Sequence, residues 1–120
     1  MADMEVKRFD APDETRDFEA HGGVAVVSVG GRQVMKGNFE PGWSWSGDVG
    51  PIAGTDSCEV SHLGYCVSGQ MKVKMDDGEE TTIGSGDVVA IPPGHHAEIV
   101  GDEACVFLDF GEIDQYAKPS

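Results

Sequence analysis

The chain has 120 residues, 39% of them hydrophobic, and its 22 acidic and 8 basic side chains give a formal net charge of −14. This length suits a single domain with its own core, and so acidic a surface repels phosphate and anionic lipid, which excludes nucleic acid and membranes as expected partners. No apolar run approaches the roughly 18 residues of a membrane helix, and three cysteines without framework spacing predict a reduced, cytoplasmic protein.

The first 54 residues change from an irregular, acidic segment to short apolar runs. We expect residues 1–23 to form an N-terminal arm or edge strand, with a turn near residues 13–17. The run VAVVSV at residues 24–29 predicts a strand that ends at Gly30-Gly31, and residues 32–40 predict the next strand. The glycine-rich stretch 42–54, which contains Trp43 and Trp45, predicts a loop or a broken strand.

A hairpin is the clearest signal in the second half of the chain. Met71, Val73 and Met75 alternate with polar residues, which predicts a half-buried strand, and Asp77-Gly78 supplies a tight turn before the returning strand. Three more strands are expected, a buried one at residues 87–91 and two others at 97–100 and 104–110. About seven to nine short strands predict an all-β sandwich or barrel over residues 24–112, followed by a tail at 113–120 with room for one helical turn.

The spacing of glycine, proline and polar residues resembles that of the cupin family. Gly50, Asp56, Cys58, His62 and Gly69 keep the spacing of the first cupin motif, G-x5-H-x-H-x3-E-x6-G. The second motif, G-x5-P-x-G-x2-H-x3-N, is kept at Gly86, Pro92 and Gly94, but Ala97 stands where the histidine belongs and Gly101 where the asparagine belongs. The resemblance implies a cupin-type jelly-roll barrel. It also implies a metal site whose usual three imidazoles and carboxylate are mostly replaced in this chain.

The residues of the first motif predict the wall of a cavity. Residues of equal parity on a strand share one face, so Asp56, Cys58 and His62 point into the barrel if no bulge intervenes. Carboxylate, thiolate and imidazole together suit a transition metal. His95 has the parity of Ala97, so we predict that the His62 and His95 imidazoles converge. Two interpretations stay open: a divalent metal (Zn, Fe, Ni or Mn) held by His62, His95, Asp56 and Cys58, or none, with Asp56 capping a turn and Cys58 in the core.

A small-molecule ligand is the expected partner of the barrel. The residues that we predict to bind it are His62, Trp45, Tyr65, Cys66 and Met75. We also expect a homodimer, because the N-terminal segment MEVKRF is able to add a strand to the sheet edge of a second copy.

Three functions are consistent with these patterns, and the sequence does not decide whether the protein is an enzyme. The first is a small-molecule-binding cupin with a weakened or absent metal site. The second is a metal-dependent oxygenase or isomerase that uses His62 and His95 with Asp56 or Cys58. The third is a module that acts through its surface, with Trp43 and Trp45 at an interface.

Overall fold

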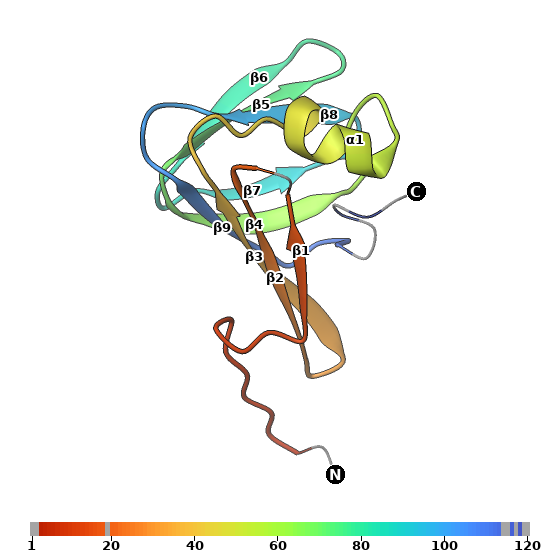
Figure 1. Cartoon of the computed structure of the whole chain (residues 1–120), viewed down its shortest axis with the longest axis vertical. Helices are drawn as coiled ribbons and strands as arrows, with labels where there is room; N and C mark the ends of the chain where they lie inside the picture. Colours follow the sequence, from red (N-terminus) through yellow and green to blue (C-terminus); the bar gives the residue numbers. More distant parts are fainter. Residues whose placement is uncertain (1–2, 19, 114–115, 117, 119–120) are drawn as a thin grey trace.

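Two antiparallel β-sheets face each other across one hydrophobic core (Figure 1). The structure is a computed structural model that describes residues 3–18, 20–113, 116 and 118. The larger sheet has the strand order β1-β2-β3-β9-β4-β7 and the smaller one β6-β5-β8. The strands are β1 (Glu14–Asp17), β2 (Gly22–Val29), β3 (Arg32–Phe39), β4 (His62–Ser68), β5 (Gln70–Met75), β6 (Glu80–Gly84), β7 (Val88–Ile91), β8 (His95–Ile99) and β9 (Cys105–Asp109).

The predicted hairpin is confirmed as strands β5 and β6. Met71 pairs with Ile83 and both are buried, whereas Lys72 points away from the core and lies within 4 Å of Glu80 and Glu98. The chain turns at Gly78, whose φ of 101° is costly for residues other than glycine. Alternation of apolar and charged residues therefore places one face of this sheet against the core and the other in solvent.

The N-terminal segment forms an arm and an edge strand, as expected, but the predicted turn within it is wrong. Residues 13–17 were expected to turn, but Glu14–Asp17 form strand β1, which pairs with β2 in the register Thr15↔Ala25. This edge strand is held by its inward side, where the Arg16 side chain is buried. Residues 3–9 have no regular structure and extend away from the sheets (Figure 1). Met4 and Val6 in this arm are exposed.

The stretch 42–54, expected to be a loop or a broken strand, contains two short helical turns instead. A π-helical turn, η1 (Trp45–Val49), leads directly into α1 (Gly50–Ala53). The Ser44 side chain caps the first turn by accepting a hydrogen bond from the Gly47 amide. Serine is a favoured residue at the start of a helix, and the sequence prediction, which considered only strands and loops here, did not use this signal. Trp43 and Trp45 are both buried, which removes the basis for an interface formed by these tryptophans.

Strand β7 was predicted to be buried, and it is instead an edge strand with one face open. Ile91 is buried, but Val88 is 72% exposed. The apolar composition misled the prediction, because nothing among the described residues covers the outer face of β7. The expected helical turn in the tail falls largely on residues outside the described ones. In the described part of the chain, no helix is long and apolar enough to cross a membrane.

Candidate metal centre

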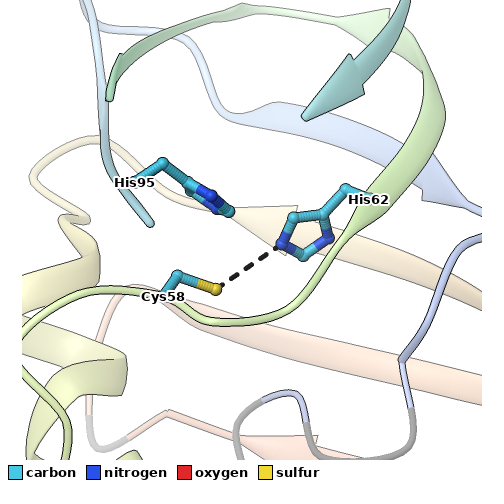
Figure 2. Close-up of side chains that lie close together, drawn as sticks. All are labelled: Cys58, His62 and His95. Carbon is cyan, nitrogen blue, oxygen red and sulfur yellow. Dashed lines mark hydrogen bonds between the residues drawn. The ribbon is translucent and has the colours of Figure 1, made fainter. Parts of the chain in front are cut away.

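Three buried side chains meet inside the barrel, and Figure 2 shows Cys58, His62 and His95 pointing toward one another. Each offers one donor atom, and these atoms all lie within 4.8 Å of one another. The two imidazole rings cross edge to face, with 5.1 Å between their centroids. The prediction that His62 and His95 converge is confirmed.

The backbone holds Cys58 and His95 side by side. The Cys58 amide donates to the His95 carbonyl at 2.8 Å, and the Cys58 carbonyl accepts from the Gly94 amide at 2.7 Å. His62 opens strand β4 opposite Ile91 on β7. Two segments far apart in the sequence therefore carry the donors. Backbone hydrogen bonds between the segments fix the spacing of the donors more firmly than a flexible loop would.

A buried carboxylate orients the His62 ring. Asp109, the last residue of β9, is fully buried and its Oδ2 hydrogen-bonds Nδ1 of His62. A carboxylate can only accept, so Nδ1 donates and Nε2 is left to face Cys58. The second Asp109 oxygen accepts from the Gly111 amide at 2.9 Å. A carboxylate behind a histidine is the arrangement that fixes the tautomer of metal-binding imidazoles.

The His95 ring is oriented in the same way by a different acceptor. Its Nδ1 lies 2.8 Å from the Pro92 carbonyl oxygen. Because a carbonyl cannot donate, Nδ1 is the donor, and Nε2 is the nitrogen left to face a ligand. Both imidazoles thus present Nε2 to the same point.

The ionisation states of Cys58 and His62 depend on each other. Burial would raise the pKa of the Cys58 thiol, but hydrogen bonds and charge from His62 and His95 outweigh burial and lower it to about 6. Burial would lower the pKa of His62, but the hydrogen bonds to Asp109 and Cys58 raise it to about 9. The sulfur is therefore ready to act as a thiolate near neutral pH, which is the form that binds metals.

The donor set fits a tetrahedral transition-metal ion. The Cys58 sulfur lies 3.6 Å from Nε2 of His62. A metal bonded to sulfur at about 2.3 Å and to nitrogen at about 2.0–2.1 Å, with tetrahedral angles, would separate these atoms by about 3.6 Å. The same distance suits a sulfur–nitrogen hydrogen bond in the metal-free protein.

Next to the donors lies a small cavity of about 30 Å³, which is room for about one water-sized group. Its apolar wall includes Met71, Phe107 and Ala97. Tyr116, from the C-terminal segment, closes one side with its ring centroid 5.4 Å from that of His62. The buried Arg16 guanidinium anchors this segment by donating to the carbonyls of residues 113 and 116.

Several predicted site residues lie away from this cavity. Asp56 is exposed in the loop after α1, because the chain from residue 59 to 61 is not a strand and the parity of β4 does not extend back to it. Tyr65 is on the outer face of β4 and 39% exposed. Trp45 is buried against His96, and Cys66 contacts Cys105 with 3.8 Å between the sulfurs. Met75 lines a separate cavity of about 120 Å³.

Two residues of the site were missed, Asp109 and Tyr116. Asp109 carried a readable signal, since it shares the parity of the buried Cys105 and Phe107 and is the one charged residue at an inward position of an apolar strand. Tyr116 carried none, because it lies in a tail without periodicity.

Comparison with known proteins gives the family and the fold. Residues 50–111 match the Cupin domain family, and no curated protein matches the chain. An RmlC-like cupin from Shewanella frigidimarina is similar in structure, with a TM-score of 0.62 and 18% identity over 92% of this chain and 94% of the other. The polyketide cyclase RemF from Streptomyces resistomycificus has a TM-score of 0.61 and 19% sequence identity, over 88% of this chain and 77% of the other. A protein of unknown function from Acinetobacter has a TM-score of 0.60 and 16% sequence identity, over 83% of this chain and 90% of the other. Sequence identities this low show a shared fold only. The family follows from the match over residues 50–111: the chain belongs to the cupin family.

Proposed function

We propose that this cupin holds one zinc ion through Cys58, His62 and His95 and binds a small organic ligand at the position that these residues leave open. The observation that carries the proposal is the convergence of the three buried donor atoms within 4.8 Å of one another. The Asp109 carboxylate behind His62 and the Pro92 carbonyl behind His95 support it, because each binds Nδ1 and so turns Nε2 toward the shared point.

Zinc is the metal that this donor set favours. A thiolate with two imidazoles suits a borderline-soft ion without geometric demands of its own, whereas manganese prefers oxygen donors. Three protein ligands with a fourth position open is the pattern of catalytic rather than structural zinc sites. When bound there, the metal would supply Lewis acidity to an oxygen atom of the ligand.

The surroundings favour a ligand with a small polar head and apolar substituents. Ile91 lines both the cavity of about 30 Å³ beside the donors and the cavity of about 120 Å³ that contains Met75. The two spaces therefore share this one lining residue. Burial raises the pKa of Tyr116 well above its usual value, so its hydroxyl stays protonated and would meet a ligand as a neutral group rather than as an anion.

Metal analysis of protein purified without a chelator tests the proposal. We expect about one equivalent of zinc in the natural protein, and below about a tenth of an equivalent in Cys58→Ser or His95→Ala. His96→Ala is the matched control, because His96 is the chain neighbour of His95 but contacts Trp45 and Asp76 outside the site. Less than about a tenth of an equivalent of any transition metal in the natural protein would refute the metal site.

A second candidate function follows from the same atoms without a metal. Cys58, His62 and Asp109 form a thiol–imidazole–carboxylate series, in which Asp109 is the orienting group that nucleophilic cysteines require. In that case the Cys58 thiolate would add to an electrophilic carbon of the ligand as a π bond of that carbon opens, and the His62 imidazolium would give its proton to the ligand atom that takes up the electron pair. Protein free of metal whose Cys58 alone is modified by a small alkylating reagent would favour this candidate over the zinc site.

A further inference from the structure

The indole N–H of Trp43 is a buried hydrogen-bond donor without an acceptor among the described residues. The Trp43 side chain is only 2% exposed, so bulk water does not satisfy this donor. A buried polar group that stays unpaired is destabilising, and such groups are rare in native proteins unless a water, an ion or a ligand pairs with them. The Trp43 indole therefore requires an acceptor that the described side chains and backbone do not supply.

Trp43 also belongs to the wall of the small cavity beside the metal donors. It lines this cavity of about 30 Å³ together with His62 and His95. The carboxylate in the same wall is already engaged, because the two oxygens of Asp109 accept from the His62 ring and from the Gly111 amide. The cavity has room for about one water-sized group. An acceptor for the Trp43 indole is therefore best accommodated in this space.

Backbone hydrogen bonds and an aromatic contact hold Trp43 in place. Its carbonyl accepts from the Ile99 amide and its amide donates to the Glu40 carbonyl, both at 3.0 Å. The first of these bonds ties Trp43 to β8, the strand that begins at His95. The indole packs edge to face against Phe39 with 4.6 Å between the ring centroids, and a phenyl ring is a much weaker acceptor than an oxygen atom. A ligand oxygen would therefore meet a donor that is already positioned.

Trp45 provides a comparison within the same chain. It is 3% exposed, and its indole N–H also has no acceptor among the described residues. Its ring packs edge to face against His96, and the described wall of the cavity does not include it. The two tryptophans share burial and an unpaired donor, but of the two Trp43 alone lies beside the metal donors. The structure thus favours Trp43 for ligand binding, whereas the sequence analysis had selected Trp45.

The charge around the cavity limits the kind of acceptor. When zinc is bound, its two positive charges are balanced by the Cys58 thiolate and the Asp109 carboxylate behind His62. An anionic ligand would add a buried charge without a counter-charge, which is costly. The net charge of −14 on the chain also repels anions before they reach the cavity. A neutral oxygen is therefore favoured over a carboxylate or a phosphate.

From these observations we infer, on the basis of the proposed ligand site, that the cavity binds a neutral carbonyl compound (a ketone, ester or amide) whose oxygen accepts from Nε1 of Trp43. An indole N–H can only donate, and a carbonyl oxygen can only accept. An alcohol would bring a hydrogen that needs an acceptor of its own, where the nearby wall is apolar at Met71, Ala97 and Phe107. Trp43 is thus a specificity-determining residue, because a site built around one hydrogen bond rejects ligands that do not form it.

Two-dimensional ¹H–¹⁵N NMR of the full chain tests the inference with acetone as the probe. Trp43 and Trp45 give two indole signals, which Trp43→Phe assigns by the loss of one of them. If that variant does not fold, Trp45→Phe assigns them by elimination. We expect acetone at millimolar concentration to move the Trp43 indole proton downfield in a saturable way and to leave the Trp45 signal in place. Acetate, which has the same planar shape and a negative charge, should bind at least about tenfold more weakly.

The two phenylalanine variants measure the contribution of the hydrogen bond. Trp43→Phe keeps an aromatic ring without the N–H, so the affinity for acetone, followed at the amide of Ala97 in the cavity wall, should fall by about three- to tenfold. Trp45→Phe is the matched control and should leave this affinity unchanged. A Trp43 signal that acetone does not move, or that acetate moves with equal affinity, overturns the inference.

Titrations with and without one equivalent of zinc separate this inference from the proposed metal site. If acetone moves the Ala97 amide and not the Trp43 indole, the ligand site stands and the role of Trp43 is refuted. If the Trp43 indole responds in a protein that takes up no zinc, the role of Trp43 stands and the metal site is refuted. If neither signal responds, the carbonyl ligand is refuted, and metal analysis decides the zinc site independently.

Discussion

The two faces of strand β4 invert the usual arrangement of a protein sheet. On the inner face, His62, Gly64 and Cys66 are polar or small, and all three are buried. On the outer face, Leu63, Tyr65 and Val67 are large and apolar, and all three are exposed. In an ordinary sheet with one wet face, apolar residues point inward and polar ones outward.

This inversion teaches that each face departs from the rule for its own reason. Small and polar residues inside leave space and donors for a metal and its ligand, at the cost of apolar packing. Apolar residues outside gain nothing while they face water, and burying them against another surface would be favourable. If the two faces are independent, substitutions on one should leave the property of the other unchanged.

The largest expected effect is on the inner face, at Gly64. A Cβ atom there would lie 2.3 Å from the Leu108 carbonyl oxygen and from the Phe107 ring. Gly64→Ala should therefore lower the free energy of unfolding by at least about 3 kcal/mol, because backbone and a buried ring would both have to move. Gly84→Ala is the control, since no atom lies within 4 Å of its Cβ position. Chemical denaturation of both variants measures the difference, and equal stabilities would contradict the tight packing at Gly64.

The next largest effect should be on metal affinity, at Asp109. Asp109→Asn keeps the shape of the side chain but removes the charge behind His62, and such changes typically weaken metal binding by about 10–100-fold. Asp48→Asn is a matched control, because Asp48 is also a buried carboxylate bonded to a histidine, His21, outside the site. Competition with a chromophoric chelator measures both affinities. An unchanged affinity in Asp109→Asn would mean that His62 needs no orienting group.

In the metal-free protein, pH should reveal the thiolate. The pKa of Cys58 is lowered to about 6, and that of His62 is raised to about 9. The ionised pair therefore persists between these values and is lost when pH falls below the first or rises above the second. Ultraviolet thiolate absorbance, taken as the difference from Cys58→Ser, should rise with a midpoint near the lower value. Cys105, whose pKa burial raises to about 12, does not interfere. A midpoint at the ordinary thiol value of 9.0 would contradict the coupling.

The smallest effect is expected on the outer face, directly beside the site in sequence. Leu63→Thr changes a side chain that points away from the His62 donor, so metal affinity should stay within about twofold and the stability of the monomer within about 0.5 kcal/mol. The chelator competition used for Asp109→Asn, together with denaturation at low protein concentration, measures both. A tenfold loss of metal affinity would show that the two faces are coupled.

The features predictable from sequence were those with a local cause. The hairpin from Met71 to Ile83 follows from alternation and from Asp77-Gly78, and the barrel follows from the spacing of glycines and prolines. The convergence of His62 and His95 follows from parity within strands. The position of Asp56 was predicted wrongly because the chain before β4 is irregular, so the alternation of faces along β4 does not extend to it. The exposure of Val88 depends on what packs against β7, and the residue pattern of the strand itself does not contain that information.

The central claim is that Cys58, His62 and His95 hold a metal, and X-ray absorption at the zinc edge tests it most directly. We expect a first shell with one sulfur at about 2.3 Å and two imidazole nitrogens at about 2.0–2.1 Å, together with one lighter atom from solvent or ligand. Cys58→Ser should remove the sulfur and leave the nitrogens. A shell of nitrogen and oxygen only, in the natural protein, would contradict the account.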